Sequence, residues 1–127
     1  MADIKGKNSA FDLEERTARF GEAVLEFVKK IPRNPINNPL ISQLVRSSTS
    51  IGANYCEADH GVSKRDFRNM IGTCRKEAKE TKHWLRMVAA ADANLKVEAR
   101  ELWQEVHELT LIFSRIYMNS RPGKNDK

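Results

Sequence analysis

Hydrophobic residues recur at steps of three and four along nearly the whole chain, which is the spacing of amphipathic helices. Short segments containing proline, glycine, serine or asparagine separate four such stretches. The pattern predicts helices over residues 12–30, 39–60, 63–93 and 95–119. Four helices of about 20 to 25 residues joined by short loops predict an all-α, up-down-up-down antiparallel four-helix bundle.

The apolar positions of each predicted helix form a seam that should face the bundle core. A further apolar line in the last helix, including Trp103 and Tyr117, exceeds what one core needs and suggests a subunit interface. The predicted seams are Leu13, Thr17, Phe20, Val24, Phe27 and Ile31; then Leu44, Val45, Ser48, Ile51, Gly52 and Tyr55; then Phe67, Ile71, Cys74, Ala78, Thr81, Leu85 and Val88; and finally Ala99, Leu102, Val106, Leu109, Phe113 and Ile116.

The helix ends follow from residues that satisfy the free backbone groups of a first or last turn. Serine, aspartate and asparagine side chains accept hydrogen bonds from the first amides, and a glycine commonly ends a helix. Residues 1–11 and 120–127 are polar and lack periodicity, so we expect disordered tails on either side of a domain over residues 12–119. The expected N-caps are Asp12, Asn38 followed by Pro39, Ser63 with Asp66, and Asn94, and Gly61 is the expected stop of the second helix.

A polar stripe runs along the second predicted helix beside a set of small residues over 47–53, which would let a neighbouring helix approach closely. With a turn near residues 61–62, facing residues of the second and third helices have numbers that sum to about 123, so Arg46 should meet Glu77 and Gln43 should meet Glu80. By the same rule Ser50 faces Thr73 and Asn54 faces Asn69. The predicted polar network comprises Gln43, Arg46, Ser50, Asn54, Glu57, Glu77 and Glu80.

This network has two interpretations. The first is a structural network that fixes the register of two helices, and the second is a polar pocket. An enzyme that uses Arg46, Glu77 and Glu80 is a further hypothesis. A buried Arg46 without its partner would be costly, so we expect Glu77→Ala to destabilise the protein strongly.

The 127 residues are enough for one domain with a core, and no apolar run is long enough to span a bilayer. The first residues lack the apolar segment of a signal peptide, so a cytoplasmic location is expected. Cys56 and Cys74 are therefore expected to be reduced packing residues.

Positive charge is concentrated in residues 64–86, where eight basic and three acidic residues give a net +5, the formal net charge of the whole chain. Spacings of seven, four, three and four place five cations on one helical stripe roughly 27 Å long, which suits a phosphate backbone. A solvated helix face that keeps the protein soluble is the alternative. No aromatic platform is expected beside the stripe, and hence no base-specific readout. The stripe consists of Arg68, Arg75, Lys79, Lys82 and Arg86.

Two Glu-x-x-His sequences, at residues 57–60 and 80–83, have the spacing that four-helix di-iron proteins use. The hairpin geometry separates them by about 21 Å along a helix, so they should not share one metal centre. The sequence also lacks a nucleophile with its base and a glycine-rich phosphate loop. We therefore expect no metal, no cofactor and no catalytic residue.

Three motifs together resemble a known family. They are Gln43 to Asn54 followed by Glu57, then Ser63 to Phe67, then Lys76 to Leu85. They are similar to the four-helix-bundle family first known from open reading frames in intervening sequences of bacterial 23S ribosomal RNA genes. The similarity covers about residues 12–119. This chain departs from the commonest pattern, because Glu57 is followed by Ala-Asp-His-Gly-Val rather than by a glycine and a turn containing arginine.

The resemblance implies a bundle that assembles into a ring, commonly a pentamer, with a link to RNA or other nucleic acid and no enzymatic activity. A related bundle is an accessory protein of diversity-generating retroelements, where its basic ring surface engages nucleic acid and the reverse transcriptase. The sequence thus suggests a non-enzymatic homo-oligomer that binds RNA or DNA through the basic stripe. The alternative is an adaptor that recruits a protein through apolar surface around Trp103, Leu111 and Tyr117. No membrane partner is expected.

Overall fold

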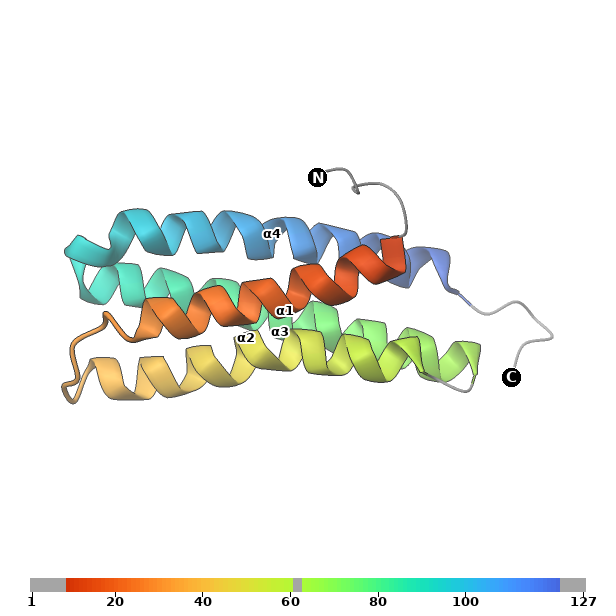
Figure 1. Ribbon diagram of the computed structural model, residues 1–127, viewed down its shortest axis with the longest axis horizontal. Helices are drawn as coiled ribbons and strands as arrows, with labels where there is room; N and C mark the ends of the chain where they lie inside the picture. Colours follow the sequence, from red (N-terminus) through yellow and green to blue (C-terminus); the bar gives the residue numbers. More distant parts are fainter. Residues whose placement is uncertain (1–8, 61–62, 122–127) are drawn as a thin grey trace.

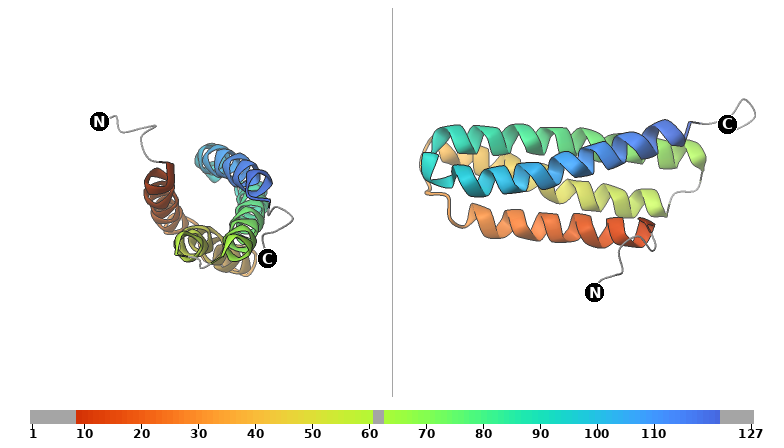
Figure 2. Two further views of the ribbon diagram at one scale, coloured as in Figure 1. Left: turned by 90° about the vertical axis from the view of Figure 1, so that its right-hand side faces the viewer. Right: turned by 90° about the horizontal axis from the view of Figure 1, so that it is seen from above.

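The computed structural model describes residues 9–60 and 63–121, which form four long α-helices and one short 3₁₀ helix (Figure 1). Successive helices run in opposite directions. Viewed end-on, they follow chain order around an arc with the first and last helices at its two ends (Figure 2). The structure confirms the predicted all-α four-helix bundle. The elements are α1 (Ser9–Val28), α2 (Asn37–Asp59), α3 (Lys64–Ala91), η1 (Ala93–Leu95) and α4 (Lys96–Asn119).

One apolar core joins all four helices, and it consists almost entirely of the predicted seams. Every predicted seam residue of the first helical stretch, from Leu13 to Ile31, is buried. Phe67, Leu102 and Ile116 are partly buried and pack against the edge of the core. The largest fully buried side chains are Phe27, Phe113, Leu44, Ile51, Ile71, Leu85, Leu109, Val24, Val88 and Val106.

Small residues of α2 do allow α1 to approach closely. A Cβ atom added to Gly52 would lie 3.1 Å from the Thr17 hydroxyl oxygen and 3.6 Å from the Thr17 backbone carbonyl carbon. Thr17 is itself buried, and its hydroxyl donates to the Glu14 carbonyl at 3.1 Å. A larger side chain at Gly52 would therefore push α1 away from α2.

Two helix starts differ from the predicted caps. At α2, the Asn34 side-chain oxygen accepts from the amides of Ile36 (3.0 Å) and Asn37 (2.7 Å), and the Asn38 side chain accepts from the Asn34 amide (3.1 Å). Asn34 thus satisfies the first free amides through a local asparagine turn, so α2 begins before the predicted Asn38 cap. At the same end of the bundle, between α3 and α4, Asp92 rather than Asn94 accepts the hydrogen bond, from the Asn94 amide at 3.0 Å.

The cap at α3 was predicted correctly, since the Ser63 hydroxyl accepts from the Asp66 amide at 3.0 Å. Helix α1 begins at Ser9, three residues before the expected Asp12, and α3 ends at Ala91 rather than at residue 93. The predicted stop at Gly61, residues 1–8 of the expected N-terminal tail and residues 122–127 of the C-terminal tail lie outside the described residues. Within residues 9–60 and 63–121, no helix is both long enough and apolar enough to cross a bilayer.

Candidate nucleic-acid interface

Helix α3 carries paired charges on the side that faces α2. The Arg46 guanidinium contacts the Glu77 carboxylate at 3.2 Å and also binds the Glu80 carboxylate. These contacts raise the pKa of Arg46, chiefly through the hydrogen bond to Glu80. The predicted meeting of Arg46 with Glu77 is therefore confirmed.

The burial of this pair is the reverse of the expectation. The Glu77 side chain is only 11% exposed, whereas that of Arg46 is 48% exposed. The predicted pairing of Gln43 with Glu80 is wrong, because the longer Arg46 side chain reaches both carboxylates while Gln43 accepts from the Arg46 Nε at 3.3 Å. Loss of Arg46, rather than loss of Glu77, would leave a buried charge without its partner.

Within residues 9–60 and 63–121, the rest of the predicted polar network does not form hydrogen bonds between helices. Ser50 donates to the Arg46 carbonyl (2.7 Å), Asn54 to the Ser50 carbonyl (2.8 Å) and Thr73 to the Asn69 carbonyl (3.2 Å), all within their own helices. Glu57 is exposed at the far end of α2. Short hydroxyl and amide side chains in helices commonly bond to the carbonyl one turn earlier, which removes them from the network between α2 and α3.

A buried polar contact that the sequence did not predict joins α2 to α3 instead. The Thr81 and Ser47 hydroxyl oxygens lie 2.8 Å apart, and both residues are completely buried. The sequence pattern places Thr81 in the apolar seam and Ser47 among the small residues that allow close packing. Two hydroxyl residues at core positions of neighbouring helices are the signal that could have identified this contact.

On the side of α3 that faces α4, the basic stripe meets aromatic rings. The guanidinium carbons of Arg68 and Arg75 lie 3.7 and 4.3 Å from the centre of the Tyr117 ring, and Arg68 Nε donates to the Tyr117 carbonyl at 3.2 Å. Gly72 provides the space for this ring, since an added Cβ would lie 3.0 Å from Tyr117 Cε1. Tyr117 therefore fixes two cations of the stripe.

A second aromatic group lies further along the same side. The Lys82 ammonium lies 4.9 Å from the Trp103 ring centre and donates to His107 Nδ1 at 2.9 Å. The Trp103 and His107 rings stack with their centres 4.9 Å apart and their planes inclined by 12°. The expectation that no aromatic platform accompanies the stripe is thus wrong, because α4 supplies one from a distant part of the chain.

The remaining two members of the stripe, Lys79 and Arg86, are exposed. Among the described residues, none of the five stripe cations forms an ion pair with a carboxylate. The ion pairs found there lie elsewhere: Arg16 with Glu105 and Glu108, Arg19 with Glu15, Lys29 with Glu26, Lys30 with Glu98, and Arg46 with Glu77 and Glu80. The stripe is consequently a basic surface whose cations form no direct ion pair in the part of the chain that the structure describes.

The two cysteines are both free but differ in environment. Cys74 is completely buried beside the Ile51 carbonyl, and burial raises its pKa to about 12. Cys56 is exposed, with its sulfur 4.0 Å from a Glu14 carboxylate oxygen, so it is not the packing residue that was expected. In the part of the chain that the structure describes, no three His, Cys, Asp or Glu side chains gather closely enough to hold a metal ion.

The fold and this surface define a small four-helix bundle with a basic and aromatic face between α3 and α4. Residues 10–115 match the family of 23S rRNA-intervening sequence proteins, and the chain belongs to that family. It is also similar to the crystal structure of a protein of unknown function from the S23 ribosomal protein family of Bacteroides thetaiotaomicron. The two chains are 25% identical and superpose with a TM-score of 0.73 over 83% of this chain and 97% of the other. The comparison with curated proteins gave no match.

Proposed function

We propose that this protein is a non-enzymatic homo-oligomer, a pentameric ring, that binds RNA or other single-stranded nucleic acid through the basic stripe of α3. The observation that carries the proposal is the absence of carboxylate partners for Arg68, Arg75, Lys79, Lys82 and Arg86 among the described residues. Five carboxylates of α3 and α4 are instead bound to cations outside these two helices: Glu77 and Glu80 to Arg46, Glu105 and Glu108 to Arg16, and Glu98 to Lys30. A family named for intervening sequences of 23S rRNA is consistent with an RNA ligand.

The mechanism is electrostatic. The cations of the stripe would displace the counterions that surround the phosphates of the nucleic acid, so affinity should fall steeply as salt rises. Tyr117 holds Arg68 and Arg75 in place, which reduces the conformational entropy that these long side chains lose on binding. A ring would present several copies of the stripe to one strand and raise the overall affinity through multivalency.

The test is the binding of labelled RNA and DNA strands, measured by fluorescence anisotropy at about 50 and 200 mM salt. A single-strand slope of about 0.7 per neutralised phosphate predicts roughly a hundredfold loss of affinity between these conditions if all five cations are engaged. The variant Arg75→Glu/Lys79→Glu/Lys82→Glu should abolish this binding. Light scattering must show the same oligomeric mass for the variant and the wild type, and a pentamer is the expected mass.

The matched control reverses three exposed cations outside the stripe, Arg33→Glu/Lys76→Glu/Arg115→Glu, and changes the net charge by the same amount. Its binding should fall far less than that of the stripe variant. Equal losses in the two variants would mean that net charge alone attracts the strand and that the stripe is not the site. The absence of binding by the intact wild-type oligomer would contradict the proposal outright.

One observation favours an adaptor as the second candidate function. Leu111 and Met118 are 55% and 56% exposed, and their spacing of seven residues places them on the same side of α4. Trp103 and Tyr117, which were expected to belong to the same apolar surface, are only partly exposed and contact cations of α3. A protein partner bound at Leu111 and Met118 would be insensitive to salt, which distinguishes it from a nucleic acid.

A further inference from the structure

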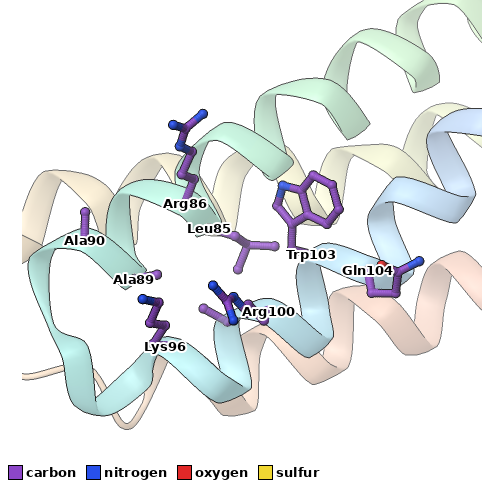
Figure 3. Close-up of a pocket in the computed structure, with 9 residues that line it drawn as sticks. Leu85, Arg86, Ala89, Ala90, Lys96, Arg100, Trp103 and Gln104 are labelled. Atoms are coloured by element: carbon purple, nitrogen blue, oxygen red, sulfur yellow. The ribbon is translucent and has the colours of Figure 1, made fainter.

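A groove of about 700 Å³ lies between the C-terminal half of α3 and the N-terminal half of α4 (Figure 3). Its inner surface includes the small side chains of Ala89 and Ala99, which leave room between the two helices. Trp103 stands on α4 at one side, and Lys96 and Arg100 lie on the same helix toward the α3–α4 connection. A groove of this size is in the range of small-molecule and nucleotide sites.

The described residues that line this groove carry only positive charge. They include Arg86, Lys96 and Arg100 and no acidic residue, and none of these three cations forms an ion pair within the part of the chain that the structure describes. The nearby carboxylate of Glu98 is instead bound at 2.7 Å to Lys30, which follows the end of α1. Three uncompensated cations around a concave surface favour an anion, and arginine is suited to bind phosphate through two parallel hydrogen bonds.

Trp103 adds a flat aromatic wall to these cations. His107, one turn later on α4, stacks on the indole, whereas Ala99 and Arg100 lie one turn earlier and line the groove. Trp103 itself lines the groove, so its indole lies within reach of a ligand there. Indole rings bind nucleobases by stacking, which does not require a particular base.

Arg86 connects the groove to the basic stripe. It is the last cation of the stripe and also lines the groove, where its side chain points outward from α3 (Figure 3). A strand whose phosphates follow the stripe would therefore reach the groove at its end. Because a base in a duplex is already stacked and paired, only an unpaired nucleotide could enter.

We infer that the groove binds one nucleotide, with its base stacked on Trp103 and its phosphate held by Lys96 and Arg100, while Arg86 contacts the adjoining phosphate. This inference rests on the proposed function in placing that nucleotide within a single strand bound along the stripe. A free mononucleotide has the same chemistry and is the other source of such a ligand. The groove thereby adds base contacts to a surface that otherwise binds only phosphates.

The experiment compares a labelled ten-nucleotide thymidine strand with an abasic strand of the same length, which keeps the phosphates and lacks the bases. Wild-type protein should bind the thymidine strand about tenfold more tightly than the abasic strand, since one stacked base contributes roughly this factor or more. Trp103→Leu should remove this preference, and its affinity for the abasic strand measures separately any effect of losing the ring beside Lys82. Trp103→Phe, which keeps an aromatic face, should retain most of it.

A second pair of variants tests the phosphate contacts. Lys96→Gln/Arg100→Gln should weaken the binding of both strands about fivefold and reduce the salt slope by roughly 0.7, the value for one lost phosphate. Lys76→Gln/Arg115→Gln removes the same charge from exposed positions outside the groove and should change neither quantity by much. Circular dichroism and light scattering check that each variant keeps its helices and its oligomeric mass.

The outcomes separate this inference from the proposed function. Equal affinity of the wild type for the thymidine and abasic strands overturns the groove as a base site, but does not contradict phosphate binding by the stripe.

Thymidine monophosphate is then added to unlabelled protein, with the fluorescence of the two tryptophans as the signal. Binding of the mononucleotide that requires Trp103, without binding of any strand, supports a nucleotide site and contradicts the proposed function. No binding of either ligand overturns both.

Discussion

Helix α3 meets its two neighbours through polar surfaces of opposite kinds. Toward α2, its carboxylates Glu77 and Glu80 are bound to Arg46, and Thr81 contacts Ser47 inside the core. Toward α4, its cations lie over the rings of Tyr117 and Trp103 and have no carboxylate partner among the described residues. The charges on the α2 side are paired with one another, whereas the cations on the α4 side are not paired with carboxylates of the described residues.

The difference indicates separate roles for the two surfaces. Paired and buried groups fix how α2 and α3 pack. Removing one of them leaves its partner buried without a hydrogen bond or counter-charge, which lowers the free energy of unfolding. Unpaired like charges on one helix repel one another and give little stability, but a polyanion relieves that repulsion. The α2 side should therefore control folding, and the α4 side should control binding.

The largest expected effect is the loss of Arg46. Arg46→Ala leaves the Glu77 carboxylate buried without a cation, so the free energy of unfolding should fall by roughly 2 kcal/mol. Glu77→Ala should cost only about 1 kcal/mol, because Arg46 is half exposed and keeps Glu80. Urea unfolding followed by circular dichroism measures both values. Nucleic-acid affinity at equal oligomeric mass should stay at the wild-type value.

Thiol labelling locates this effect within the bundle. Cys74 lies in the core between α2 and α3, so a thiol reagent reaches it only when the helices open. In a Cys56→Ser background, Arg46→Ala should accelerate the labelling of Cys74 at least about tenfold. A greater loss of stability in Glu77→Ala than in Arg46→Ala would contradict the assignment of Glu77 as the buried partner.

The elements that the sequence predicted best depend on local periodicity. The seam from Leu13 to Ile31 follows from a single helical repeat, and the pairing of Arg46 with Glu77 follows from the geometry of one hairpin. The cap at Asn34 was missed because Asn34 and Asn38 compete within the same few residues, and the loop conformation decides between them. The sequence thus predicts which residues of a helix face the core, but it does not predict which of two neighbouring asparagines caps the helix.

The aromatic side of the candidate interface could not be predicted for a different reason. Arg68 and Tyr117 are separated by 49 residues, and their contact depends on how α4 is rotated against α3. Gly72 makes the contact possible, but a lone glycine within a helix has several explanations. The charge pattern therefore identified the basic stripe, while the rings that hold it required the packing of two helices.

The next effect in size tests whether Tyr117 supports the stripe. Tyr117→Leu removes the ring that lies against Arg68 and Arg75, and we expect the protein to lose about 1 kcal/mol of stability. Tyr117→Phe keeps the ring and should remain within about 0.3 kcal/mol of the wild type, because cation–π contacts depend on the ring face. Urea unfolding measures both variants, and equal losses would show that the hydroxyl group, not the ring, stabilises this contact.

The smallest expected effect has the opposite sign and tests the comparison most directly. Lys79 is exposed and lies one turn from both Arg75 and Lys82, so Lys79→Gln should leave stability unchanged or raise it by up to about 0.5 kcal/mol at low salt. Lys29→Gln is the matched control, because Lys29 pairs with Glu26 at 3.0 Å and its loss should lower stability by about 0.3 kcal/mol. Both differences should shrink at high salt, where exposed charges are screened. A clear loss of stability in Lys79→Gln at low salt would mean that Lys79 has a stabilising partner, and the α4 side of α3 would then be no more available to a polyanion than the α2 side.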